Sequence, residues 1–339
     1  MNRMDQAFAD ERGQYRILRK GNKLSITLNL DARKNLAKDM KSRSSDVTFC
    51  MKFAIYMLGV GYGVSCSLSG NLALEVFGII LLGAMFAHGV ELQHQVLHNQ
   101  GFKKGIFNEI AGILVGLPML VSFAGYQASH LRHHRLLGTK ENKEFFDYGD
   151  QYGATRFATV LLWAKRFLMP AHYQGFLKNV FRGLFSRPVP GESPDVAKRI
   201  RRDHLIMLGS ISALILISVA THIPVVLLAW VLPLVLVAAP MHALIEMPEH
   251  YRCDVNSTDV FKNTRTIKSN PFMTWFTNGN NFHVEHHLMP GLPIDRLHDL
   301  HATIVQNIPH LYESYREFYS DVFRNRIKNA SENVSEKDQ

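Results

Sequence analysis

The chain has 339 residues, of which 38 are Lys or Arg and 29 are Asp or Glu, which gives a formal net charge of +9. Its three cysteines are too few and too scattered for a disulfide framework or a cysteine-based metal site. The basic excess forms no motif with interleaved aromatic residues, so we expect no nucleic-acid partner. No secretory signal peptide is expected, because the first forty residues lack an apolar core.

Hydrophobic residues are concentrated in four blocks that are nearly free of charge. Each block approaches the ~20 residues needed to cross the hydrocarbon layer of a bilayer, so we predict four transmembrane helices. The predicted spans cover residues 47–68, 72–90, 205–220 and 223–243. A shorter apolar run at about 110–124 contains two glycines and Pro118, which predicts a re-entrant or interfacial hairpin.

The basic residues predict the orientation of the spans. Eleven precede the first span and sixteen lie between Gln93 and Arg202, whereas the short turns at 69–71 and 221–222 contain none. By the positive-inside rule, both termini and the middle segment face the cytoplasm. We therefore expect a multi-pass protein of the cytoplasmic (inner) membrane, with two hairpins joined to cytoplasmic segments.

The expected fold is an all-α integral membrane protein with four transmembrane helices in two hairpins and a cytoplasmic helical cap. Residues 1–46 form an N-terminal cytoplasmic segment, in which 24–30 alternate apolar and polar residues as a short strand does. Residues 47–310 form the membrane domain, and its cap comprises 125–204 and 244–310. An interfacial helix is expected at 157–169. Residues 311–339 form a C-terminal helix and tail.

Nine of the 17 histidines fall into four groups, all on the expected cytoplasmic side. Spacings of three and four residues place each set of rings on one helical face. Nine imidazoles are too many for one ion with four to six ligands, so the natural count is two metal ions. The other eight histidines are interpreted as structural, although His88 and His242 lie close to the groups. The nine candidates are His94, His98, His130, His133, His134, His250, His283, His286 and His287.

This pattern of HxxxH, HxxHH and HxxHH boxes resembles the integral-membrane fatty acid desaturase and hydroxylase superfamily. The segments 129–135, 263–267 and 281–290 are similar to the flanks of the boxes in bacterial acyl-lipid desaturases, and the resemblance covers residues from about 50 to 310. Glu249-His250-Tyr251 resembles the extra histidine segment of membrane alkane hydroxylases, which adds His250 as a ninth ligand. The resemblance implies two iron ions (Fe²⁺), O2 as co-substrate and desaturation of a fatty acyl chain.

Metal-binding imidazoles usually donate their second N–H to a carboxylate or a carbonyl group. The sequence offers several acidic candidates for this role and does not rank them. They are Glu91, Asp147, Glu246, Glu249, Glu285 and Asp299.

Two alternatives remain open at this point. The same centre can hydroxylate a lipid, an alkane or a carotenoid, and the boxes do not distinguish the two reactions. A histidine-rich metal transporter or sensor is a different class, but transporters place their ligands near the bilayer midplane. A zinc protease is excluded, because neither HExxH nor HxxEH occurs.

The electron donor and the substrate carrier are expected to be separate molecules. The chain contains no dinucleotide-binding glycine motif and no haem-carrier motif, so a ferredoxin, a rubredoxin or a haem protein is implied as the donor. The bilayer and an acyl-lipid, acyl-CoA or acyl-carrier substrate complete the expected partners. Chain length, the position of the new bond and the oligomeric state are not predicted.

Overall fold

The computed structural model describes residues 46–142, 155–254 and 256–324, and the backbone of three short strands near the N-terminus. These strands form an antiparallel sheet in the order β1 (Gln6–Ala9), β2 (Tyr15–Lys20) and β3 (Lys23–Leu28). The strand expected at 24–30 therefore lies in β3 as far as Leu28. The rest of the predicted N-terminal segment and the tail after residue 324 lie outside the described residues.

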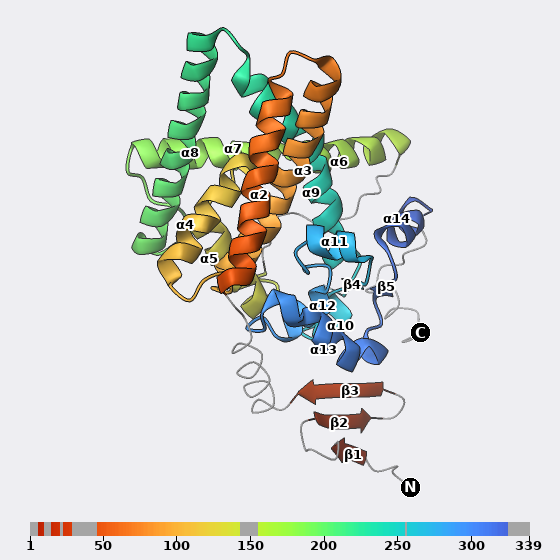
Figure 1. Cartoon of the computed structure of the whole chain (residues 1–339). Coiled ribbons are helices and arrows are strands. Elements are labelled where there is room, and N and C mark those ends of the chain that lie inside the picture. The colour runs from red at the N-terminus through yellow and green to blue at the C-terminus, as the bar shows by residue number, and fades with distance from the viewer. Residues whose placement is uncertain are drawn as a thin grey trace.

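Four helical segments of the described chain are long and apolar enough to cross a membrane, which confirms the predicted number of spans. They form two hairpins whose tips lie at the same end of the molecule (Figure 1). Helix α8 begins well before its apolar block. Most residues of its first turns, 195–203, are charged. The spans are α2 (Asp46–Ser67), α3 (Leu72–Leu97), α8 (Pro194–Thr221) and the segment Leu227–Glu249.

The fourth span is wound irregularly. It begins as the π-helical segments η2 (Leu227–Val231) and η3 (Pro233–Ala238), and continues as α9 (Ala239–Glu246) and the 3₁₀ turn η4 (Met247–Glu249). Pro233 has no N–H, and its ring would clash with a carbonyl group in a regular α-helix, so the wider π turns accommodate it.

A sharply bent helix pair lies between the two hairpins. Helix α4 (Gly105–Gly116), the turn η1 (Leu117–Met119) and helix α5 (Phe123–Leu136) meet at 98°, the geometry of a broken span or a re-entrant loop. The buried carboxylate of Asp203 on α8 fixes the start of α5. It accepts hydrogen bonds from Ser122 Oγ at 2.8 Å and from the Ala124 amide at 2.9 Å. Helix α8 thereby sets the direction of α5.

Two amphipathic helices run across the spans (Figure 1). They are α6 (Arg156–Leu168), which matches the expected interfacial helix, and α7 (Pro170–Leu184). Apolar side chains such as Phe157, Leu161 and Leu177 are exposed on them. These apolar faces suit the boundary between lipid and water.

Short elements after the fourth span build the C-terminal part of the cap. Its small apolar core contains Phe282, Leu292 and Leu300, and β4 pairs in parallel with β5. The elements are α10 (Val260–Asn263), β4 (Thr266–Ile267), α11 (Pro271–Phe276), α12 (His283–Leu288), η5 (Ile294–Arg296), α13 (Leu297–Ile304), η6 (Val305–Asn307), β5 (Leu311–Tyr312) and α14 (Tyr315–Phe323).

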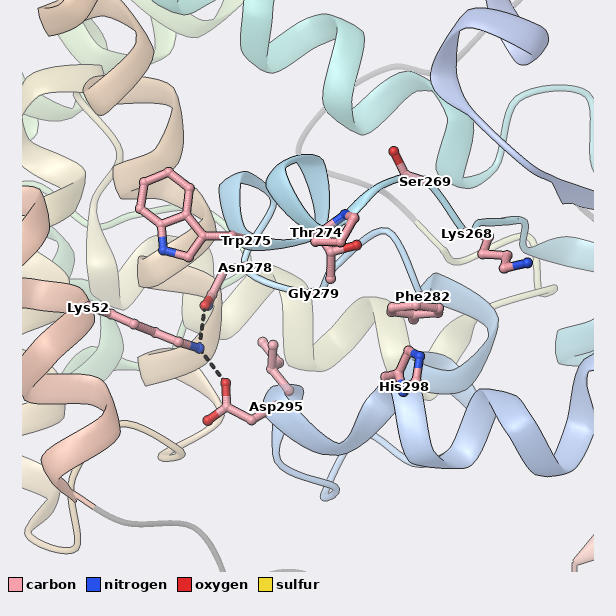
Figure 2. Close-up of a pocket in the computed structure, with 12 residues that line it drawn as sticks. Lys52, Lys268, Ser269, Thr274, Trp275, Asn278, Gly279, Phe282, Asp295 and His298 are labelled. Carbon is pink, nitrogen blue, oxygen red and sulfur yellow. Dashed lines mark hydrogen bonds and ion pairs between the residues drawn. The ribbon is translucent and has the colours of Figure 1, made fainter.

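Polar contacts join this cap to the first span beside a cavity of about 510 Å³ (Figure 2). Lys52 on α2 forms an ion pair with Asp295 and donates a hydrogen bond to Asn278 Oδ1 at 2.8 Å. Asn278 in turn donates to the Glu91 carbonyl oxygen at 3.2 Å and to Gln95 Oε1 at 3.0 Å on α3. The cap is thus tied to both helices of the first hairpin.

The two hairpins pack closely at Gly83 on α3. A Cβ atom at this position would lie 2.3 Å from Val237 Cβ and 2.8 Å from the Pro233 carbonyl oxygen. Only a residue without a side chain allows this approach between α3 and η3.

We predict that Gly83→Val lowers the thermal unfolding temperature of the purified protein in detergent. The added side chain overpacks the contact between the hairpins, at a cost of about 1–3 kcal/mol. Gly61→Val on α2 is the matched control, because a Cβ atom there meets nothing within 4 Å. Equal unfolding temperatures for the two variants would contradict the close packing at Gly83.

Candidate metal centre

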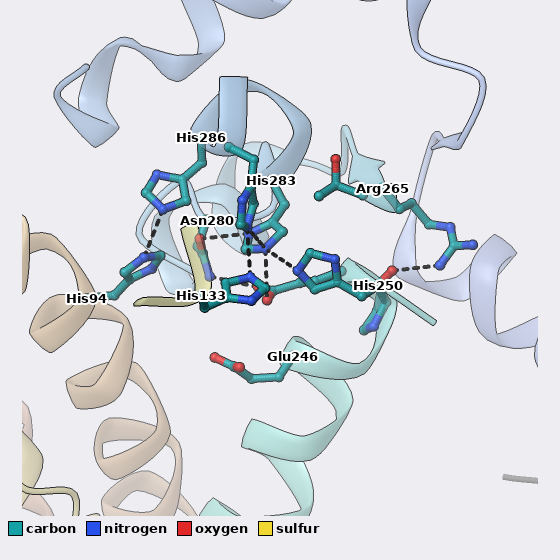
Figure 3. Close-up of polar contacts among 12 residues, drawn as sticks. His94, His133, Glu246, His250, Arg265, Asn280, His283 and His286 are labelled. Carbon is teal, nitrogen blue, oxygen red and sulfur yellow. Dashed lines mark hydrogen bonds and ion pairs between the residues drawn. The ribbon is translucent and has the colours of Figure 1, made fainter. Parts of the chain in front are cut away.

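The nine clustered histidines come from four parts of the chain. His94 and His98 lie at the end of α3, and three more lie on α5, which the bend after α4 brings back beside α3. His250 follows the fourth span, and the last three lie on α12. Figure 3 shows α12 placing His283 and His286 opposite residues from the spans. Segments far apart in the sequence therefore meet at the cap end of the membrane domain.

Five of these histidines form one group, with one ring nitrogen of each within 4.8 Å of the others. His130 Nε2 lies 2.8 Å from both His94 Nε2 and His134 Nε2. His286 Nε2 lies 3.1 Å from His94 Nε2 and 2.9 Å from His134 Nε2. We call His94, His98, His130, His134 and His286 the five-histidine group.

The remaining four, His133, His250, His283 and His287, form a second group on the same distance criterion, which we call the four-histidine group. His287 Nε2 lies 3.3 Å from His133 Nε2 and 3.0 Å from His283 Nε2. His283 Nε2 lies 3.1 Å from His250 Nε2. Helix geometry explains how the histidines divide between the two groups. Residues four apart share a helical face, whereas the side chains of consecutive residues point about 100° apart. The adjacent histidines of each HH pair therefore serve different groups.

Hydrogen bonds determine which nitrogen carries the proton in two of these rings. His250 Nδ1 lies 2.7 Å from the Asn263 carbonyl oxygen, which can only accept, so Nδ1 carries the proton. Asn280 donates from Nδ2 to Glu249 Oε1 at 2.7 Å, which turns its Oδ1 towards His283 Nδ1 at 3.3 Å. The lone pairs on Nε2 of His250 and His283 consequently point into the four-histidine group.

Burial keeps these rings neutral. It lowers the pKa of His98 to about 3, and it lowers the pKa of His283, His286 and His287 well below the usual value. The positive charge of neighbouring imidazoles would lower the last three further. Wherever two ring nitrogens at 2.8–3.4 Å both lack a proton, their lone pairs repel each other unless a cation lies between them. Each group can hold one metal ion.

The chain is similar to known proteins along most of its length. The sequence model of the family described as fatty acid desaturase matches residues 71–319, which include all nine clustered histidines. The chain belongs to the fatty acid desaturase family. It is also similar to dihydrorhizobitoxine desaturase of Bradyrhizobium elkanii, with 25% identity over 241 residues that cover 66% of each chain. The match thus spans just under two thirds of that protein's length. The chain is thus a multi-pass membrane protein of the fatty acid desaturase family.

Of the expected acidic partners, Glu249 lies beside a histidine group and Glu285 lies on the helix that carries three of the histidines. Glu249 approaches His283 Nε2 with its Oε2 at 3.3 Å, so it lies next to the inward-facing nitrogens instead of behind a ring. Glu285 points the other way from α12. Its Oε1 accepts from His301 Nδ1 at 2.5 Å, and its Oε2 accepts from Thr266 Oγ1 at 2.6 Å. Glu285 therefore anchors α12 to α13 and β4.

The other acidic candidates lie elsewhere. Glu91 and Glu246 group with His242, 3.9 and 4.0 Å from its Nδ1, so the structural interpretation of His242 is incomplete. Asp299 pairs with Arg296 at 3.0 Å on the exposed face of α13. Asp147 lies outside the described residues.

Two further residues support the site through contacts that the sequence pattern did not predict. Arg265 is almost fully buried, stacks on Phe318 and Tyr312, and donates to the Pro248 carbonyl oxygen at 2.6 Å. It thereby fixes the backbone just before His250 (Figure 3). His301, which was expected to be structural, holds Glu285. Both contacts join separate elements, so spacing along the chain does not reveal them.

We predict that the metal-free desaturase loses stability as the pH falls below about 6.5. In the unfolded chain the histidines gain protons there, whereas the folded rings stay neutral to lower pH, so acid favours unfolding. Each such ring contributes about 1.4 kcal/mol per pH unit across this window. Thermal unfolding of chelator-treated protein at stepped pH values measures the slope.

His287→Asn should reduce this slope, because it removes one buried ring. His222→Asn is the control, since His222 is exposed at the end of α8 with φ 57°, a conformation that Asn tolerates. A flat profile in the parent protein would contradict the assignment of neutral buried imidazoles.

Proposed function

We propose that this desaturase introduces a double bond into a fatty acyl chain, using O2 and two iron ions held by the five- and four-histidine groups. The observation that supports the proposal is the convergence of imidazole nitrogens in two groups. When bound, the irons would supply the reduction of O2 that makes removal of hydrogen from an unactivated C–H bond possible.

The donor set fits two iron ions. Imidazole nitrogens are ligands that suit iron, and five and four of them stay within the four to six positions of one ion. The tautomers of His250 and His283 are set by Asn263 and Asn280, so their lone pairs are oriented before a metal arrives. Glu249 adds a carboxylate oxygen beside the four-histidine group, which offsets part of the cationic charge.

The chain's own residues orient these donors and exclude water. Asp203 directs α5, and Glu285 with His301 and Thr266 holds α12 against the rest of the cap. Most of the clustered rings are buried, which limits access of bulk water to the reaction. We infer that an acyl chain reaches the site laterally from the bilayer and that a ferredoxin, rubredoxin or haem protein delivers the electrons.

The same geometry gives less support to a metal transporter, and it does not distinguish hydroxylation from desaturation. A transporter needs donors along a path through the membrane, whereas the nine rings form two groups contributed by the end of α3, by α5, by the residue after the fourth span and by α12. Hydroxylation would use the same groups, and product chemistry separates it from desaturation.

Lipid profiling of a host with and without the gene is the direct test. We expect acyl chains that have lost two hydrogens in cells with the parent protein, and none above background with His130→Ala or His286→Ala. Iron content of the purified variants should fall as well. His222→Asn serves as the control and should retain both properties. Products that gain one oxygen would assign hydroxylation, and iron-replete, active box variants would refute the diiron proposal.

We also propose that the histidine groups and both termini face the cytoplasm, because basic residues avoid the turns at the hairpin tips. A green fluorescent protein fused to the C-terminus should then fluoresce in a bacterial host. Alkaline phosphatase fused at the same point should be inactive, because it requires export. The reverse pair of results would place the cap on the outer side. The proposed division into 1–46, 47–310 and 311–339 stays a prediction.

A further inference from the structure

Glu91, His242 and Glu246 form a third group of donors, separate from the nine clustered histidines. One donor atom of each lies within 4.8 Å of the others. His242 Nδ1 is 3.9 Å from Glu91 Oε1 and 4.0 Å from Glu246 Oε1. These distances exceed hydrogen-bond range. They fit donors around one ion, because two atoms each about 2.1 Å from a metal are separated by at most about 4.2 Å.

The three side chains are buried between α3 and α9, with exposed fractions of 1% for Glu91, 0% for His242 and 6% for Glu246. Ionised carboxylates at such positions are costly unless they are paired or bind a metal. Neither Glu91 oxygen meets the geometry of a hydrogen bond with any described group, although the Asn280 side chain lies near enough to interact with it. The 3.9 Å distance from Glu91 Oε1 to His242 Nδ1 places this carboxyl group against the other two members of the group.

We propose that Glu91, His242 and Glu246 bind a third divalent transition-metal ion, such as Zn²⁺ or Fe²⁺. Two carboxylates balance the charge of a divalent ion, and a neutral imidazole adds a donor without adding charge. Mixed carboxylate and imidazole donors suit these ions. The site goes beyond the proposed reaction and does not depend on iron at the histidine groups.

The position of the third group indicates what this ion does. Glu91 lies about one helical turn before His94 on α3, and Glu246 lies about one turn before His250. In Figure 3 the Glu246 side chain extends from α9 on the side of the histidines that faces the spans. An ion at this point links the first hairpin to the second and fixes the spacing of the helix ends that carry both histidines.

The test is the number of metal ions bound by the full-length protein in detergent after anaerobic loading with Fe²⁺, measured by inductively coupled plasma mass spectrometry. We expect three ions per parent chain, and two in Glu91→Gln and in His242→Gln. Glu75→Gln, in the first turn of α3, and His204→Gln, which replaces a buried histidine on α8, are matched controls and should bind three. Glu91 and His242 variants that bind as many ions as the parent protein would overturn the proposal.

A second measurement does not depend on the folding of variants. Anomalous diffraction from crystals of the parent protein loaded with Fe²⁺ should show a peak between Glu91, His242 and Glu246, and its absence would exclude the site. The diiron proposal fails separately, since it requires His286→Ala to lose iron from the five-histidine group. Peaks at the two histidine groups without the third would leave that proposal standing.

Discussion

Repulsion between converging nitrogen lone pairs is the constraint on which the rest of this structure depends. A neutral imidazole has only one N–H, so buried rings whose nitrogens face several others at hydrogen-bond distances cannot place a proton in every contact. A cation bound between the nitrogens would satisfy each group. The surrounding protein must hold the rings in this arrangement. Much of the polar structure in the cap serves that purpose, because the apolar packing of the spans alone does not orient a ring.

The supporting contacts act at successive distances from the rings. The Asn263 carbonyl oxygen and Asn280 Oδ1 fix individual rings by accepting hydrogen bonds from Nδ1, while Glu285 fixes the helix that carries three of the rings. Farther out, Asp203 directs α5 and Lys52 ties the cap to the first span. Asp203 and Glu285 are buried anions held by hydrogen bonds, so loss of a partner leaves a charge unsatisfied. A substitution at these outer positions is therefore expected to displace the ring nitrogens of the two histidine groups.

The sequence predicted what depends on periodicity within one element. Charge-free blocks predicted the four spans, and spacings of four placed His130 with His134 and His283 with His287 on shared faces. Contacts between elements could not be predicted from the sequence, because they depend on how each helix is rotated about its axis. Glu91 illustrates this limit: it was expected behind a clustered histidine, but the packing of α3 against α9 places it with His242. Arg265 and Asp203 are likewise identified only by the partners that the fold gives them.

The location of α12 late in the chain has a consequence for the biogenesis of the protein. Six of the nine clustered histidines precede Asn280, so they leave the ribosome and reach the membrane before the last three exist. Until α12 docks, the five-histidine group lacks His286 and the four-histidine group lacks both His283 and His287. Incomplete donor sets would hold metal weakly, so under the proposed function a nascent or truncated chain would lack a complete metal centre. The order of synthesis would then delay metal binding until the membrane domain is in place.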